Sequence, residues 1–279
     1  KTANATINGT IQKIDFNRYT YQNIDLKGAI DAGLFDLKGQ STDSNLTFDL
    51  ISSGSFKDKY PAGTVHLNVD IAHLEKLNLH AGPLKIRGVL NADIQSADID
   101  YLNGSFTIKN LTVADAVTQI VTDSISVIAS STPTKNTLDF KSPFMNGQVA
   151  GKYKLSTIGA ALSRSISNYY SATGYSKARE IENQQLEFKI GINDSPLLVK
   201  LIPGLTSLEP IAISGRYTTV NDSIVLSAAI PKLIYGGNTI TNAVFKIDTQ
   251  DNALVYNLMV DDVQNTQFQL PYTSLTGKV

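Results

Sequence analysis

Apolar and polar residues alternate along most of this chain. In the segment YQNIDLKGAID, the apolar residues Ile24, Leu26 and Ile30 stand at even-numbered positions, whereas the charged residues Asp25 and Lys27 stand at odd-numbered positions. The same alternation recurs over 46–50, 65–71, 84–90, 186–190 and 254–260. Because the side chains of a β-strand point alternately to its two faces, this pattern predicts many strands that each have one apolar and one polar face.

Short turn signals separate the predicted strands. Asp31-Ala32-Gly33, Asn103-Gly104, Asn146-Gly147 and Gly236-Gly237-Asn238 are combinations typical of tight turns. Connections this short join antiparallel neighbours, so we predict an antiparallel sheet of about sixteen strands and no βαβ units.

One segment departs from the alternation. Between 157 and 172, Ile158, Leu162 and Ile166 recur at helical spacing, and Ser156 precedes them as a candidate N-cap. We predict a helix there, followed by a helical or loop stretch to about residue 184. The predicted organisation is a β block over 1–155, the helix and connecting segment over 156–184, and a second β block over 185–279 that continues the same sheet.

The predicted fold class is therefore all-β with one inserted helix, built on an elongated and curled antiparallel sheet. Its apolar faces can either seal against each other in a sandwich or line an open groove. The candidate groove-lining residues are Leu46, Phe48, Leu50, Val65, Leu67, Val69, Leu84, Ile86, Leu186, Phe188, Ile190, Ile211, Ile213, Ile224, Leu226, Phe245 and Ile247.

A weak internal repeat accompanies the strand pattern. Residues 238–247 align with residues 19–28, which places Asn242 on Asn23, and residues 105–114 carry a comparable phrase that begins at Asn110. The matching segments are short. They can reflect either a true repeat or a chance match in an Asn-rich chain.

Composition narrows the classes of partner. The chain of 279 residues is 42% hydrophobic and 18% charged, and its formal net charge is −1. It lacks the basic stripe expected of a nucleic-acid binder. It contains no cysteine and no apolar run of the roughly 18 residues that a membrane-spanning helix needs. Because it begins with Lys1 and not Met, we expect a segment of a longer protein, with any membrane anchor outside it.

No constellation typical of catalysis is visible. His66, His73 and His80 lack a metal-binding motif, and on a continuous strand His66 and His73 would face opposite ways. The carboxylates of Asp93, Asp98 and Asp100 suit a solvated strand face. We therefore expect no catalytic residues, no metal ligands and no cofactor, and a protein that is not an enzyme.

Residues 9–56 contain a strand that ends near Tyr21, then an Asn-Ile-x-Leu-x-Gly strand and a Gly-centred turn. This segment resembles the repeating unit of bacterial TamB-like proteins (translocation and assembly module), which belong to the AsmA-like family. The resemblance is strongest to the TamB-like proteins of Bacteroidota. Residues 97–115 and 140–166 are similar in kind.

The resemblance implies a U-shaped "β-taco" groove in a periplasmic protein anchored at the inner membrane. It implies phospholipid acyl chains as partners, an outer-membrane protein of the Omp85 class at one end, and a role in lipid transport or outer-membrane protein assembly. The helix stripe Ile158, Leu162 and Ile166 would then either pack on the sheet or plug the groove. A surface adhesin or carbohydrate-binding module is the alternative.

Overall fold

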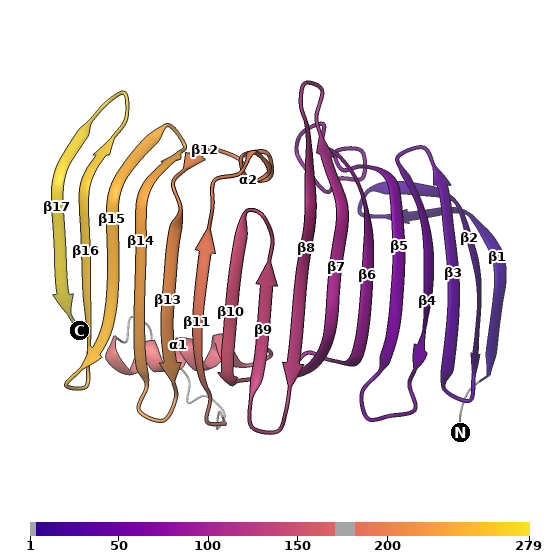
Figure 1. Ribbon diagram of the computed structural model, residues 1–279, viewed down its shortest axis with the longest axis horizontal. Coiled ribbons are helices and arrows are strands. Elements are labelled where there is room, and N and C mark those ends of the chain that lie inside the picture. The colour runs from indigo at the N-terminus through magenta and orange to yellow at the C-terminus, as the bar shows by residue number, and fades with distance from the viewer. Residues whose placement is uncertain (1–3, 171–181) are drawn as a thin grey trace. The chain divides into compact units, whose positions relative to one another are not determined.

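The computed structural model describes residues 4–170 and 182–279. Its seventeen strands belong to one antiparallel sheet that does not close on itself (Figure 1). The predicted all-β fold with a curled antiparallel sheet is confirmed, and the described strands do not form a sandwich of two separate sheets. The chain divides into two compact units: unit 1 comprises residues 1–98 and 102–129, and unit 2 comprises residues 99–101 and 130–279.

Unit 1 contains β1 (Ala5–Phe16), β2 (Tyr19–Asp31), β3 (Leu34–Asp43), β4 (Leu46–Ser55), β5 (Ala62–His73), β6 (Lys85–Asp98), and all but the terminal residues of β7 (Tyr101–Ala114) and β8 (Gln119–Ser131). Each strand from β1 to β5 pairs with the next strand in the chain, and β7 pairs with β8. Strands β6 and β7 also lie side by side, since a Cβ atom built on Gly88 would lie 3.3 Å from the Cα atom of Leu111.

Unit 2 contains β9 (Asn136–Lys141), β10 (Met145–Lys152), α1 (Ile158–Tyr169), β11 (Gln185–Ile192), α2 (Pro196–Leu201), β12 (Leu205–Leu208), β13 (Ile211–Thr218), β14 (Ser223–Tyr235), β15 (Asn238–Gln250), β16 (Ala253–Gln264) and β17 (Gln269–Lys278). The strands pair in the order β9, β10, β11, β13, β14, β15, β16, β17, and β12 pairs with β14 beyond the end of β13.

The predicted helix over 157–172 is confirmed as α1. The stretch predicted to continue to residue 184 lies mostly outside the described residues. Helix α2 was not predicted, although Ser195 and Pro196 are a typical helix start: the Ser195 side chain accepts a hydrogen bond from the amide of Leu197 at 3.2 Å, and proline stands at the first helical position.

The register gives unit 1 one apolar face and one polar face. Leu26, Gly39, Leu50, Leu67 and Leu90 lie opposite one another on β2 to β6. The next row, on the opposite face, is Asp25, Gln40, Asp49, Asn68 and Val89. Directly paired residues point to the same side of a sheet, so the alternation predicted from the sequence produces continuous rows across strands.

Glycines make room for aromatic rings on the apolar face of unit 2. One row across β10 to β17 is Val149, Phe188, Gly215, Leu226, Ile247, Tyr256 and Gly277. A Cβ atom on Gly215 would lie 2.7 Å from the Phe188 ring, and one on Gly277 would lie 2.1 Å from the Tyr256 hydroxyl oxygen. The rings therefore occupy the space that a side chain at the paired position would fill.

Three asparagines interrupt long strands at equivalent places. Asn23 in β2, Asn110 in β7 and Asn242 in β15 have φ values of 53°, 53° and 49°. Strand pairing skips each position and resumes in the same register. Asparagine tolerates this left-handed conformation better than most residues, which explains its use at a break in an extended backbone. The three positions aligned by the sequence repeat thus share one backbone conformation.

Strand β5 contains one extra residue near Asp70, since the pairing with both β4 and β6 shifts there. Beyond the extra residue, odd-numbered and even-numbered side chains of β5 exchange faces. His73 therefore pairs with Lys85 on the polar face, where His66 also lies. An uninterrupted strand would have put these histidines on opposite faces, and the extra residue puts them on the same face. Two predicted turns were wrong, because Asn103-Gly104 lies within β7 and Asn146-Gly147 lies within β10.

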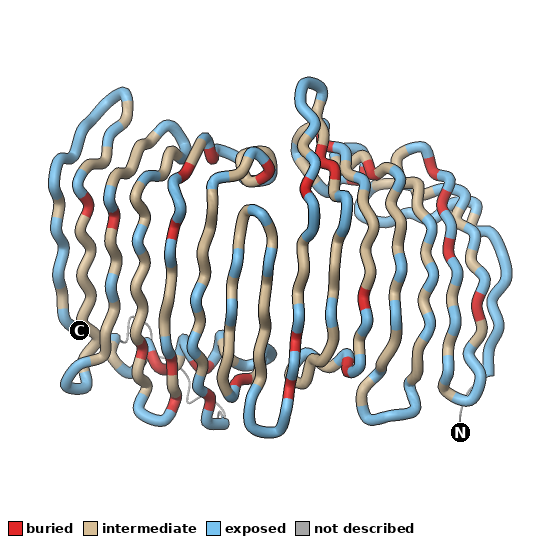
Figure 2. Tube along the Cα trace, viewed as in Figure 1, coloured by how far each residue is buried: buried red, intermediate tan, exposed pale blue. Residues whose placement is uncertain are grey.

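A loop closes one end of unit 1. The tip of the β1–β2 hairpin meets the connection between β5 and β6, where Asn17 Nδ2 donates to the carbonyl of Leu77 at 3.2 Å and Asn78 Nδ2 donates to the carbonyl of Asn17 at 3.0 Å. The connection buries Leu77 and Leu84, which are 2% and 3% exposed. Elsewhere buried residues are sparse along the strands, and most positions are half-buried or exposed (Figure 2).

Candidate functional site

The strand pairing places the candidate groove residues of each unit, apart from Leu84, on that unit's apolar face. Leu84, Ile211 and Ile224 are buried, and the other fourteen residues are half-buried. Leu84 lies in the loop just before β6, and the others lie on strands. The candidates Leu46, Phe48, Leu50, Val65, Leu67, Val69 and Ile86 belong to unit 1 with Leu84, and the remainder belong to unit 2. Apolar side chains that keep part of their surface exposed can contact a hydrophobic guest.

In unit 2 two helices cover the two ends of the apolar face. Helix α1 packs on a cluster around Tyr217 and Ile224, with Leu186, Ile247 and Leu254 at its border. Near the other end of β11 and β13, Leu198 and Val199 of α2 pack on a second cluster around Ile211, with Ile192 and Ile230 at its border. The rows between the two clusters contain Phe188, Ile190, Leu226 and Phe245, all half-buried. We call these four residues the apolar window.

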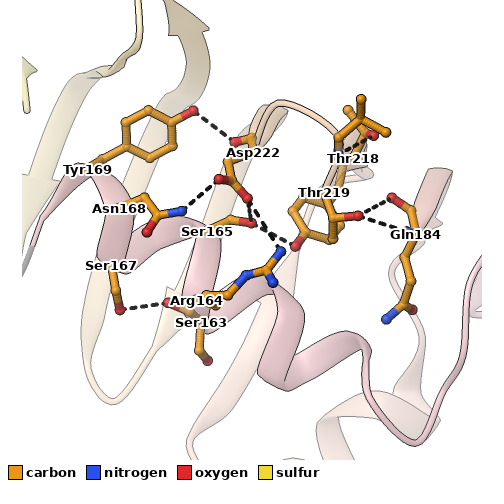
Figure 3. Close-up of polar contacts among 12 residues, drawn as sticks. Ser163, Arg164, Ser165, Ser167, Asn168, Tyr169, Gln184, Thr218, Thr219 and Asp222 are labelled. Atoms are coloured by element: carbon orange, nitrogen blue, oxygen red, sulfur yellow. Dashed lines mark hydrogen bonds and ion pairs between the residues drawn. The ribbon is translucent and has the colours of Figure 1, made fainter. Parts of the chain in front are cut away.

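Polar contacts hold α1 on the sheet (Figure 3). Ser165, which is fully buried, shares a hydrogen bond of 2.9 Å with the Tyr217 hydroxyl and donates another to the carboxylate of Asp222. Asn168 Nδ2 donates to the same carboxylate at 2.6 Å, and the Tyr169 hydroxyl donates to the Asp222 backbone carbonyl at 2.9 Å. The β13–β14 turn is therefore the anchor of the helix.

The environment of Tyr217 follows from the same contacts. Burial raises the pKa of its hydroxyl most, the Ser165 hydrogen bond lowers it, and the Asp222 charge raises it further. The net shift is upward, so the hydroxyl stays protonated and serves as a structural contact.

The buried face of α1 is displaced from the predicted stripe. Ile158 packs against the sheet, but Leu162 and Ile166 are 37% and 41% exposed. Ala161 and Ser165 take the buried positions instead, because the Asp222 contacts orient the helix. The predicted N-cap was wrong as well: Thr157 holds that position, and Ser156 donates to the carboxylate of Asp100.

A buried carboxylate stabilises the closed end of unit 1. Asp43 is 3% exposed and accepts hydrogen bonds from the Tyr19 hydroxyl at 2.5 Å and from the amides of Gln22 and Asn45 at 2.8 Å each. Burial alone would raise the pKa of Asp43, but these hydrogen bonds outweigh burial and the net shift is downward. The pKa of Tyr19 is raised, first by burial and then by its bond to Asp43.

The histidines and the other aspartates do not converge. His66 Nδ1 contacts Asn91 Oδ1 at 2.7 Å, whereas His80 contacts Gly82. Asp93 accepts from Gln95, and Asp100 holds Ser156. In the part of the chain that the structure describes, no group of three or more histidine, aspartate or glutamate residues is arranged to hold a metal ion.

No protein-family model matches this chain, and no curated protein and no solved structure is significantly similar to it. The resemblance to TamB-like proteins therefore rests on the residues quoted above. Among the described residues no helix has the length and apolar character needed to cross a membrane.

Proposed function

We propose that the apolar faces of this protein bind phospholipid acyl chains, as part of a TamB-like periplasmic protein that moves lipid between the inner and outer membranes or assists outer-membrane protein assembly. The observation that carries the proposal is the set of continuous rows of half-buried aliphatic and aromatic side chains across successive strands. The opposite face of the same strands is polar and suits water.

The energetics favour reversible contact. Burial of one methylene group contributes about 0.8 kcal/mol, so a dozen methylenes that each lose half of their exposure would gain about 5 kcal/mol. The rows contain few polar groups, so an acyl chain meets a similar surface at each step. A uniform lining of this kind lets a chain slide across successive strands without a deep minimum.

The helices of unit 2 suit the same role. They cover the two ends of the apolar face and leave the apolar window between them. A guest in the window would contact Phe188 and Leu226 while its headgroup stayed in water. Through the family resemblance, we further propose that the longer protein is anchored at the inner membrane and delivers its cargo to an outer-membrane protein of the Omp85 class.

Site-specific photo-crosslinking tests the proposal. A benzophenone side chain replaces Phe48 on the apolar face or Asp49, its neighbour on the polar face of the same strand. With phosphatidylethanolamine vesicles, irradiation should give a lipid adduct at position 48 and little at position 49. Equal labelling, or labelling at position 49 alone, would contradict the proposal.

A further inference from the structure

The polar face of unit 2 is hollowed over β10, β11, β13 and β14. A cavity of about 650 Å³ and an adjoining cavity of about 300 Å³ share Ala150, Glu187, Arg216 and Val225 in their linings. These four residues are paired with one another across the four strands, in a row that lies on the polar face of the sheet. We call the two cavities together the basic hollow. Its charged residues lie on the opposite face of the sheet from the row of the apolar window, and Phe188 of the window also borders the smaller cavity. The anion proposal rests on the charged residues and is independent of the acyl-chain proposal.

Positive charge is concentrated in the basic hollow. Lys135 and Lys152 line the larger cavity, Lys189 lines the smaller one, and Arg216 lines both. Among the described residues of the two linings, Glu187 is the single acidic one. Four cations and one carboxylate give a local charge of +3, in a chain whose formal net charge is −1.

Among the residues that the structure describes, no carboxylate forms an ion pair with these cations. Glu187 is paired directly with Arg216 across β11 and β13, yet within the described ranges 4–170 and 182–279 neither it nor any other carboxylate lies within 4.0 Å of the four cationic groups. By contrast, Lys154 contacts Glu182 at 2.8 Å. Asp139, on the same face, accepts a hydrogen bond from Gln148.

We propose that the basic hollow binds an anion that carries two or more phosphate groups. A guanidinium group can bind phosphate through two parallel hydrogen bonds, and ammonium groups add positive charge from either side. Lys189 is paired with Gln148, four residues from Lys152 on β10, so these lysines stand about 13 Å apart along the strands. That spacing exceeds a single phosphate and suits two or more.

The phosphates can belong to a soluble polyphosphate or phosphorylated sugar, or to lipid headgroups. Calorimetric titration at low salt distinguishes these sources, with sodium tripolyphosphate as one probe and phosphatidylcholine vesicles with or without phosphatidylglycerol as the other. Saturable binding of tripolyphosphate alone indicates a soluble ligand. Binding to the phosphatidylglycerol vesicles that tripolyphosphate reverses indicates headgroups. Both results support the proposal, and binding of neither probe overturns it.

Variants test whether the hollow is the site. Arg216→Gln should weaken binding at least about tenfold, since a charge-assisted bond is lost. Arg216→Lys should restore part of the affinity. Lys152→Gln should weaken binding by several fold, whereas Lys13→Gln, an exposed change on β1 of unit 1, should leave it unchanged. Equal weakening by Lys13→Gln would show that binding follows total charge and would overturn the assignment. Circular dichroism confirms that each variant is folded.

Discussion

Replacement of Asp222 by alanine should release helix α1 from the apolar face of unit 2 while the strands stay paired. The carboxylate receives hydrogen bonds from Ser165 and Asn168, which both lie on α1. The sheet itself has no comparable need of this side chain, because Asp222 lies in the turn between β13 and β14. The change therefore separates helix docking from sheet stability.

The magnitude follows from the contacts that are lost. A hydrogen bond to a charged group contributes about 1.5–3 kcal/mol, and the exposed Asn168 should be near or below the lower limit. Arg164, at 4.0 Å and partly exposed, adds little. The Ser165–Tyr217 bond and the Tyr169 bond to the backbone carbonyl remain. The expected loss in helix docking is about 2–3 kcal/mol, or about 30- to 150-fold in the opening equilibrium.

Hydrogen exchange of the amides of residues 158–169, read by mass spectrometry, measures this opening. Asp251→Ala is the matched control, because Asp251 also lies in a hairpin turn and has the same φ of 51° as Asp222. Loss of protection in α1 alone, absent in the control, is the expected outcome. If β13 and β14 lose protection together with α1, or if the control behaves alike, the anchoring role assigned to Asp222 is refuted.

Three further predictions concern the fold. Asn242→Val should be about 1–2 kcal/mol less stable than Asn242→Gly in urea unfolding, because both lose the amide's hydrogen bond but only valine opposes a positive φ; equal stability would contradict a left-handed residue there. Gly215→Ala should cost about 1–3 kcal/mol, whereas Gly9→Ala, whose Cβ atom would meet nothing within 4 Å, should be neutral; a neutral Gly215 variant would contradict the close packing. Asp43 has a lowered pKa, so its contribution to stability is present above its unfolded pKa of about 3.9 and is lost as the pH falls through the lower, folded pKa. The Asp43→Asn variant should thus be less stable at pH 7 and should lose less stability than the wild type on acidification; parallel pH profiles would contradict this.

The strands and their apolar and polar faces were predictable from the sequence because apolar residues at every second position indicate a β-strand with one apolar face. Leu50 and Leu67 occupy the apolar face because each continues an alternation that a pleated strand must obey. Helix α1 was predictable for the equivalent reason at helical spacing. These signals are local, and local signals suffice where nothing interrupts the strand.

What could not be predicted depends on contacts distant in the chain. The extra residue near Asp70 moves His73 to the other face of the sheet, and no residue type at this place in the sequence indicates an extra residue. Leu77 is buried because the β1–β2 hairpin meets its loop, sixty residues away in sequence. Helix α1 buries Ser165 and exposes Leu162 because Asp222 decides its orientation, against the more apolar stripe. Helix α2 is short, and only its Ser195-Pro196 start could have revealed it.

The central claim is that acyl chains contact the apolar faces, and paramagnetic NMR tests it most directly. Lipid with a nitroxide near the end of its acyl chain is added to protein with labelled isoleucine, leucine and valine methyl groups. The methyl signals of Leu50 and Leu226 should broaden, whereas those of Ile51, which is 53% exposed on the polar face, should not. Broadening of Ile51 to the same extent, or no broadening of Leu50 and Leu226, would contradict the account.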